Sequence, residues 1–168
     1  MSRALVASAA LVVALSPGAA AAAPAPLEAP IRGLTIGPIE NARHKDRGYG
    51  SDAYLRAVAE ARALGATWVS LTPFGRVLDL SPTGVALGFE APFAQNRAAV
   101  LAAIRQARVA GLKVLVVPHL WVESGGWRAL VDPGSDAGWA AWAAAYRRFA
   151  VTWAEVAREG GAEMFAVG

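Results

Sequence analysis

From residue 31 to the end of the sequence, short apolar runs alternate with longer amphipathic segments. This alternation is typical of β-α units that build a parallel sheet buried on both faces. The runs that predict strands are residues 31–39, 67–74, 113–122 and 163–168. The segments that predict helices are residues 52–64, residues 96–110 and a longer one around residues 139–156. The sequence therefore predicts an α/β fold in the order β, α, β, α, β, α, β, with right-handed crossovers.

The third predicted helix carries large side chains at alternating three- and four-residue steps, so that they share one face. They are Trp139, Trp142, Tyr146, Phe149, Trp153 and Val156, and Gly160 and Gly161 end the helix. A coiled-coil seam is the alternative, but bulky aromatic side chains suit packing against a sheet or a neighbouring helix better. We therefore expect this stripe to lie in the core.

Two architectures fit such a parallel sheet, a doubly wound sheet and part of a (β/α)₈ barrel. A doubly wound sheet usually carries a glycine-rich ligand-binding loop after its first strand, but residues 36–40 contain no G-x-G-x-x-G motif, and the sequence has no P-loop. Polar and aromatic residues instead collect where the predicted strands end, as they do on the catalytic face of a barrel. Because 168 residues fall short of the roughly 250 of a closed barrel, three β-α units and a fourth strand would make up only part of a barrel.

The first 30 residues have a different composition from the rest. Arg3 precedes an apolar run over residues 4–15, a Ser-Pro-Gly break follows, and small residues come next. This order predicts a secretory signal peptide over residues 1–23, cleaved near residues 21–23. Three prolines then make residues 24–30 a semi-rigid linker into the folded domain, residues 31–168. We expect a secreted or periplasmic protein with no membrane attachment after cleavage.

The composition excludes several classes of site. The chain has no cysteine, so disulfides, thiolate nucleophiles and cysteine-ligated metal sites are ruled out. Its two histidines, His44 and His119, are far apart in the sequence, and we predict no metal site and no cofactor. The net charge is +3, but the basic residues are scattered among alanines at helical spacing, which argues against nucleic acid as a partner.

Polar and aromatic residues near the ends of three predicted strands form a candidate binding site. His119, Trp121 and Glu123 alternate along one strand, so their side chains share one side. Taken singly, His119 also fits a partly buried structural histidine and Glu123 a solvated loop carboxylate. Indoles stack on the apolar faces of sugar rings, whereas imidazole, carboxylate and guanidinium groups bind hydroxyls. The predicted substrate-binding residues, for a polysaccharide or oligosaccharide, are His119 and Trp121, then Phe74, Arg76, Glu123 and Asn41.

Four stretches of the sequence carry a family resemblance. They are residues 65–75 (GATWVSLTPFG), 111–121 (GLKVLVVPHLW), 138–146 (GWAAWAAAY) and 162–168 (AEMFAVG). In this order and spacing, the sequence from about residue 31 to the end resembles family 113 of the glycoside hydrolases, which are β-mannanase-like (β/α)₈ enzymes of the large retaining glycosidase clan. Val117 departs from the pattern, because many relatives have lysine there.

The resemblance implies a mechanism that needs two carboxylic acids about 5 to 5.5 Å apart. In this clan the acid/base glutamate ends the fourth barrel strand and the nucleophilic glutamate ends the seventh, and the resemblance implies that both lie beyond Gly168. We assign no acidic residue of this chain to catalysis. The resemblance therefore implies the N-terminal half of a (β/α)₈ barrel, truncated at its fourth strand, that belongs to a secreted, retaining glycoside hydrolase. We expect this fragment, from a truncated or interrupted gene, to be inactive at this length.

Two alternatives stay open from the sequence. The first is a secreted, non-catalytic protein that binds glycans or another partner through a half-barrel, closed by dimerisation through its open sheet edges. The second is a barrel enzyme with another substrate, such as a phosphorylated one, whose phosphate site would follow the seventh and eighth strands. The sequence does not predict the sugar, the linkage or the oligomeric state.

Overall fold

The structure is a computed structural model, and it describes residues 30–37 and 46–167. The chain divides into two units, residues 1–30 and residues 31–168. The predicted signal peptide lies outside the described residues, and so does the predicted linker apart from Pro30. Within the described part, no helix combines the length and the apolar composition needed to cross a membrane.

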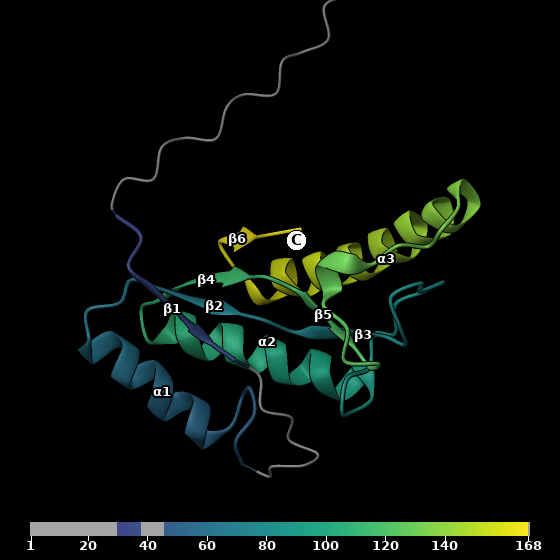
Figure 1. Cartoon of the computed structure of the whole chain (residues 1–168). Coiled ribbons are helices and arrows are strands. Elements are labelled where there is room, and N and C mark those ends of the chain that lie inside the picture. The colour runs from purple at the N-terminus through teal and green to yellow at the C-terminus, as the bar shows by residue number, and fades with distance from the viewer. Residues whose placement is uncertain (1–29, 38–45, 168) are drawn as a thin grey trace, which may run out of the picture. The chain divides into compact units, whose positions relative to one another are not determined.

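The second unit is built on a four-stranded parallel sheet (Figure 1). Its strands, in spatial order, are β1 (Gly33–Ile36), β2 (Trp68–Leu71), β4 (Lys113–Val116) and β6 (Met164–Phe165). The spatial order follows the chain order, which is the arrangement of a barrel, whereas a doubly wound sheet reverses direction at a switch point. The predicted α/β fold is confirmed, and among the described strands β1 and β6 form the two edges of this sheet.

Three α-helices connect these strands. They are α1 (Asp52–Ala63), α2 (Phe93–Val109) and α3 (Asp136–Gly160). The hydroxyl oxygen of Ser51 accepts a hydrogen bond from the backbone N–H of Tyr54 at the start of α1, and Ser135 does the same for Gly138 at the start of α3. Gly161 ends α3 with a φ of 80°, a left-handed conformation that glycine adopts at no steric cost.

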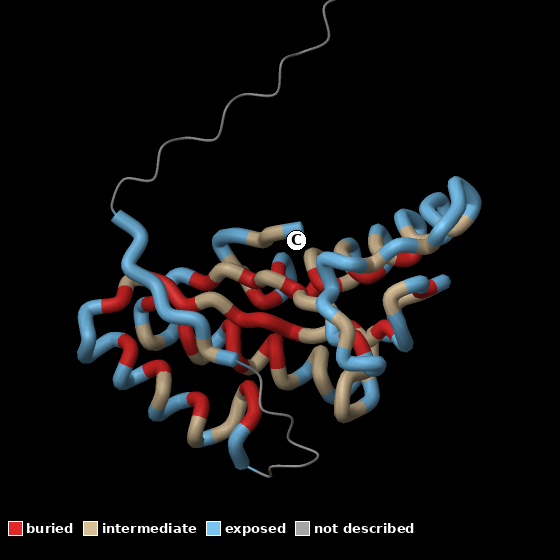
Figure 2. Tube along the Cα trace, viewed as in Figure 1, coloured by how far each residue is buried: buried red, intermediate tan, exposed pale blue. Residues whose placement is uncertain are grey.

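The core lies between the sheet and the helices. Val69, Leu71, Val114 and Val116 alternate along β2 and β4 and are fully buried. Buried residues, in red, follow the central strands and recur along the helices (Figure 2). Thr35 and Ser70 occupy the alternate positions of β1 and β2, so they lie on the opposite face of the sheet. The oxygens of these two hydroxyl groups lie 2.7 Å apart. The sheet therefore has two different faces. The helices cover the apolar face, and they leave the other face, which is more polar, uncovered.

The aromatic stripe of α3 enters the core only in its C-terminal part. Phe149 and Trp153 have no solvent exposure, and Val156 is buried beside them. Trp142 and Tyr146 are partly exposed, and 46% of Trp139 is exposed. The core interpretation is therefore wrong for Trp139, because α3 begins at Asp136 and its first turns project beyond the sheet (Figure 1).

Two of the predicted strands are interrupted, each at a proline. The run over residues 67–74 breaks after β2, and a further strand, β3 (Phe74–Val77), begins at its last residue and continues into the predicted loop. The run over residues 113–122 divides into β4 and β5 (His119–Val122). Pro73 and Pro118 stand at the two breaks, and proline has no N–H to donate to a ladder. The register between the two strand pairs nevertheless continues across the breaks. Trp68 of β2 pairs with Lys113 of β4, and Phe74 of β3 pairs with His119 of β5 at the same separation in sequence.

Candidate functional site

Strands β3 and β5 extend beyond β2 and β4 at the carboxyl edge of the sheet, where parallel α/β proteins bind their ligands. In their register Phe74 lies opposite His119, and Arg76 lies opposite Trp121. The backbone N–H of His119 donates to the carbonyl oxygen of Pro73 over 2.8 Å, which joins the two strands just after the breaks. Four of the predicted site residues are therefore neighbours across one short ladder.

The packing of Gly75 shows which way the side chains of β3 point. A Cβ atom on Gly75 would lie 2.5 Å from a ring carbon of Phe149, so this side of the strand is packed directly against α3. Successive residues of a strand point to opposite faces. Phe74 and Arg76 therefore point away from α3.

Four rings gather on this side and form what we call the aromatic cluster: Phe74, Phe89, His119 and Trp121. The rings of Phe74 and Phe89 are stacked, with centroids 5.1 Å apart. His119 and Trp121 meet the ring of Phe74 edge-on, at 5.6 Å and 6.3 Å. Trp121 also meets Phe89 at 6.0 Å, and 49% of Trp121 remains exposed. The cluster thus presents an indole to solvent above a packed aromatic base.

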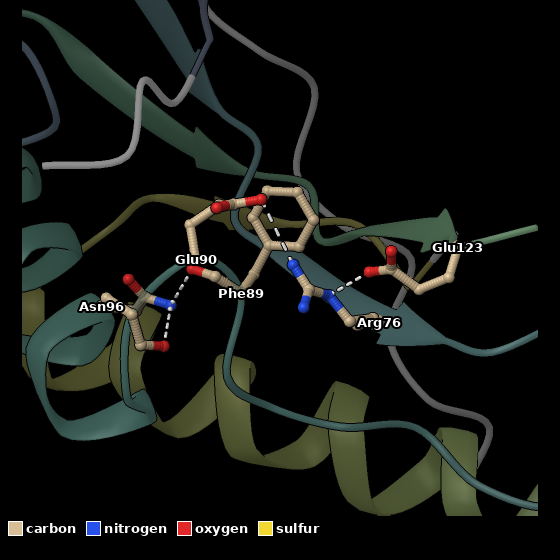
Figure 3. Close-up of polar contacts among 6 residues, drawn as sticks. Arg76, Phe89, Glu90, Asn96 and Glu123 are labelled. Carbon is tan, nitrogen blue, oxygen red and sulfur yellow. Dashed lines mark hydrogen bonds and ion pairs between the residues drawn. The ribbon is translucent and has the colours of Figure 1, made fainter. Parts of the chain in front are cut away.

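Arg76 lies between two carboxylates beside this cluster (Figure 3). Its Nη2 is 3.3 Å from Oε1 of Glu90, and its Nε is ion-paired with Glu123. The guanidinium carbon also lies 5.0 Å from the centroid of the Phe89 ring, a cation-π arrangement. One cation therefore holds together β3, the residue that follows β5, and the loop that carries Phe89.

The loop that carries Phe89 and Glu90 is fixed by further hydrogen bonds. The Asn96 side-chain amide donates to the carbonyl oxygens of Phe89 and Ala91, at 2.9 Å and 3.3 Å (Figure 3). Arg76 and Ala86 exchange two backbone hydrogen bonds of 2.9 Å each. Glu90 has a φ of 57°, a left-handed conformation that is costly for a residue other than glycine. The surrounding contacts keep Glu90 in this strained conformation.

The pKa of His119 is lowered from its ordinary value of 6.5, first by burial and then by the positive charge of Arg128. Arg128 begins the short helix η1 (Arg128–Leu130), which contacts β5. A neutral imidazole has one donor and one acceptor nitrogen, so it can exchange hydrogen bonds with a hydroxyl group in either direction. The environment of His119 therefore favours this neutral form.

The lowered pKa of His119 predicts a pH dependence of stability. The unfolded chain binds a proton at this residue more readily than the folded chain, so the stability that His119 contributes is complete above about pH 6.5 and is lost as the pH falls below it. We expect the free energy of unfolding, measured with urea, to fall more between about pH 7.5 and about pH 5.5 in the wild type than in His119→Gln. Equal falls would contradict this, and the comparison cancels any contribution from His44.

The structure brings together five of the six predicted site residues, namely Phe74, Arg76, His119, Trp121 and Glu123. Asn41 lies outside the described residues. Sequence reasoning missed Phe89 and Glu90. A signal was available, because residues 78–92 form a loop of about 15 residues between a strand and a helix, and loops of this length are usually functional.

The chemistry of this site suits a polyhydroxylated ligand with apolar faces. The aromatic cluster offers flat apolar surface, and Arg76, Glu123 and His119 offer donors and acceptors around it. Among residues 30–37 and 46–167, no group of three or more histidine, aspartate or glutamate side chains is placed to hold a metal ion.

Comparisons with known proteins agree with the α/β fold. The model of Glycoside Hydrolase Family 113 matches residues 42–168. A solved complex of a β-1,4-mannanase of that family is 24% identical, with a TM-score of 0.66, over 82% of this chain and 45% of that one. A β-mannanase of the family from Alicyclobacillus acidocaldarius, in complex with ManMIm, is 27% identical, with a TM-score of 0.66, over 82% of this chain and 44% of that one. The chain thus spans less than half the length of these structures, and no curated protein matches it.

Proposed function

The chain belongs to glycoside hydrolase family 113, and on this premise we propose that it supplies the first part of the barrel of a secreted, retaining, β-mannanase-like enzyme. In this proposal the aromatic cluster binds the sugar rings of a β-mannan chain. The observation that carries it is the exposed indole of Trp121 above the stacked rings of Phe74 and Phe89, with Arg76 and Glu123 beside them. The similarity to two β-mannanase structures supports the choice of mannan.

The carboxylates at this site support a binding role over a catalytic one. A retaining glycosidase needs one carboxylic acid that protonates the leaving oxygen and a second that attacks the sugar. Glu90 and Glu123 are both paired with Arg76, and through these pairs they hold the loop that carries Phe89 and the end of β5 in place. Glu163 lies at the other end of the sheet, where it accepts a hydrogen bond from the N–H of Val114 and pairs with Arg108. We therefore propose that this chain binds sugar without hydrolysing it.

The central test is sugar binding by the aromatic cluster. We expect Trp121→Ala to weaken the binding of mannohexaose by about tenfold, roughly 1.4 kcal/mol, because the main exposed stacking surface is lost. Trp121 is half exposed, so the fold should persist, and isothermal titration calorimetry with a circular dichroism check measures both properties. Unchanged affinity would remove Trp121 from the proposed site.

A second experiment separates the enzyme from a non-catalytic glycan-binding protein, which the paired carboxylates also favour. The protein isolated from its natural source is assayed on β-mannan, and its intact mass shows whether the predicted signal peptide has been removed. Hydrolysis with retention of the anomeric configuration, by a protein whose mass exceeds that of this chain, supports the proposed enzyme. Tight binding without hydrolysis, by a protein whose mass is that of this chain without its first 23 residues, supports the glycan-binding alternative.

A further inference from the structure

A second exposed indole lies in the loop that follows β5. Trp127 is 63% exposed, although tryptophan is among the costliest side chains to leave in water. The guanidinium carbon of Arg128 lies 5.3 Å from the centroid of its ring. The indole therefore carries a cation against its ring and leaves much of its apolar surface to solvent.

The loop around Trp127 is held in place by its neighbours. The N–H of Gly125, at a φ of 78°, donates to the carbonyl oxygen of Val122 over 3.0 Å. A Cβ atom on Gly126 would lie 2.9 Å from Leu80, so the backbone there packs closely on the loop after β3. The N–H of Asp132 donates to the carbonyl oxygen of Leu80 over 2.7 Å. These contacts hold the backbone on either side of Trp127 and reduce the entropy that ordering this loop on a ligand would cost.

Arg128 connects Trp127 to the site. Helix η1, which starts at Arg128, contacts β5, the strand that carries His119 and Trp121. The charge of Arg128 acts on His119, whose ring meets that of Phe74. The aromatic cluster, Arg128 and Trp127 thus follow one another along the ends of β3 and β5 and the loop beyond.

We propose that Trp127 is a second sugar-stacking position, separate from Trp121, and that the ligand is an oligosaccharide long enough to reach both indoles. This inference rests on the proposed function of the aromatic cluster. The apolar face of one sugar ring would lie on Trp127 while Arg128 donates hydrogen bonds to its hydroxyl groups. A short ligand would occupy only the aromatic cluster, so Trp127 sets a preference for chain length.

The test compares a short and a long ligand by isothermal titration calorimetry of the whole chain. We expect Trp127→Ala to weaken mannohexaose binding about fivefold and to leave mannobiose binding unchanged. Trp127→Phe keeps a flat ring and should retain most of the affinity for mannohexaose. Leu130→Ala is the matched control, because Leu130 is also 63% exposed and lies in the same turn but has no ring, and it should change neither affinity.

The outcomes distinguish this inference from the function on which it rests. If Trp121→Ala weakens both ligands while Trp127→Ala weakens neither, the aromatic cluster binds sugar and the second position is refuted. An equal loss for both ligand lengths in Trp127→Ala also refutes it. If the wild-type chain binds neither ligand, the proposed function fails, and the second position fails with it.

Discussion

Replacement of Trp153 by alanine is expected to destabilise the domain by about 3–5 kcal/mol, the range for a fully buried large aromatic side chain. Trp153 has no solvent exposure, and its ring meets that of Phe93 edge-on at 5.4 Å. Its indole N–H has no hydrogen-bond partner among the described residues. The loss is therefore one of packing, because α3 and α2 would meet across a cavity instead of an indole.

The matched control is Trp139→Ala, which removes the same side chain from the same helix where 46% of it is exposed. We expect this variant to lose less than about 1 kcal/mol. Urea denaturation followed by circular dichroism gives the free energy of unfolding of both variants. Equal m-values, the slopes of this free energy against urea concentration, verify that both variants expose the same amount of surface on unfolding. Equal losses in the two variants would mean that the buried and exposed ends of α3 contribute alike, contrary to the packing described.

The alternation along β3 and β5 explains why the sequence predicted so much of the site. Residues two apart on a strand share a side, so the common orientation of His119 and Trp121 follows from their spacing alone. The offset between strands survives Pro73 and Pro118, and for this reason the partners Phe74 and Arg76 also lie where the sequence predicts. The breaks themselves were not predicted, because both apolar runs continue through their prolines.

The length of the loop over residues 78–92 marks it as a candidate functional loop, but the positions of Phe89 and Glu90 within the site do not follow from the sequence. Their position depends on contacts between residues far apart in the chain, such as the pairing of Arg76 with Ala86 and of Arg76 with Glu90. No local periodicity encodes such contacts in an irregular loop. Trp139 illustrates the converse, because its helical spacing is correct but the sheet does not extend far enough to cover it. Periodicity predicts which residues lie on the same face of a helix. Whether that face is buried depends on how far the neighbouring sheet and helices extend along it.

The contacts of Arg76 lead to the second large effect, on binding. Arg76→Met keeps a long apolar side chain but removes the cation that pairs with Glu90 and Glu123 and lies over Phe89. The contact with Glu90 is a charge-assisted hydrogen bond, a kind that contributes about 1.5–3 kcal/mol, whereas the contact with Glu123 is an ion pair in which Nε makes no hydrogen bond. Without them the loop that carries Phe89 is no longer tied to β3, and two carboxylates lose a shared counter-charge. We expect mannohexaose binding to weaken by roughly 30-fold, about 2 kcal/mol.

Two further variants show whether this loss comes from the arrangement of Arg76 or from charge alone. Arg76→Lys keeps the charge but has a single nitrogen, which cannot serve both carboxylates and stack on Phe89 together, so it should recover only part of the affinity. Arg97→Met removes a cation of similar exposure that pairs with Glu159 between α2 and α3, and an exposed pair of this kind should cost less than about 1 kcal/mol of stability and leave binding unchanged. Full affinity in Arg76→Lys would show that charge alone suffices. The ladder of β3 and β5 brings Phe74, His119 and Trp121 together, and the guanidinium of Arg76 adds Phe89 to them by holding its loop against these strands.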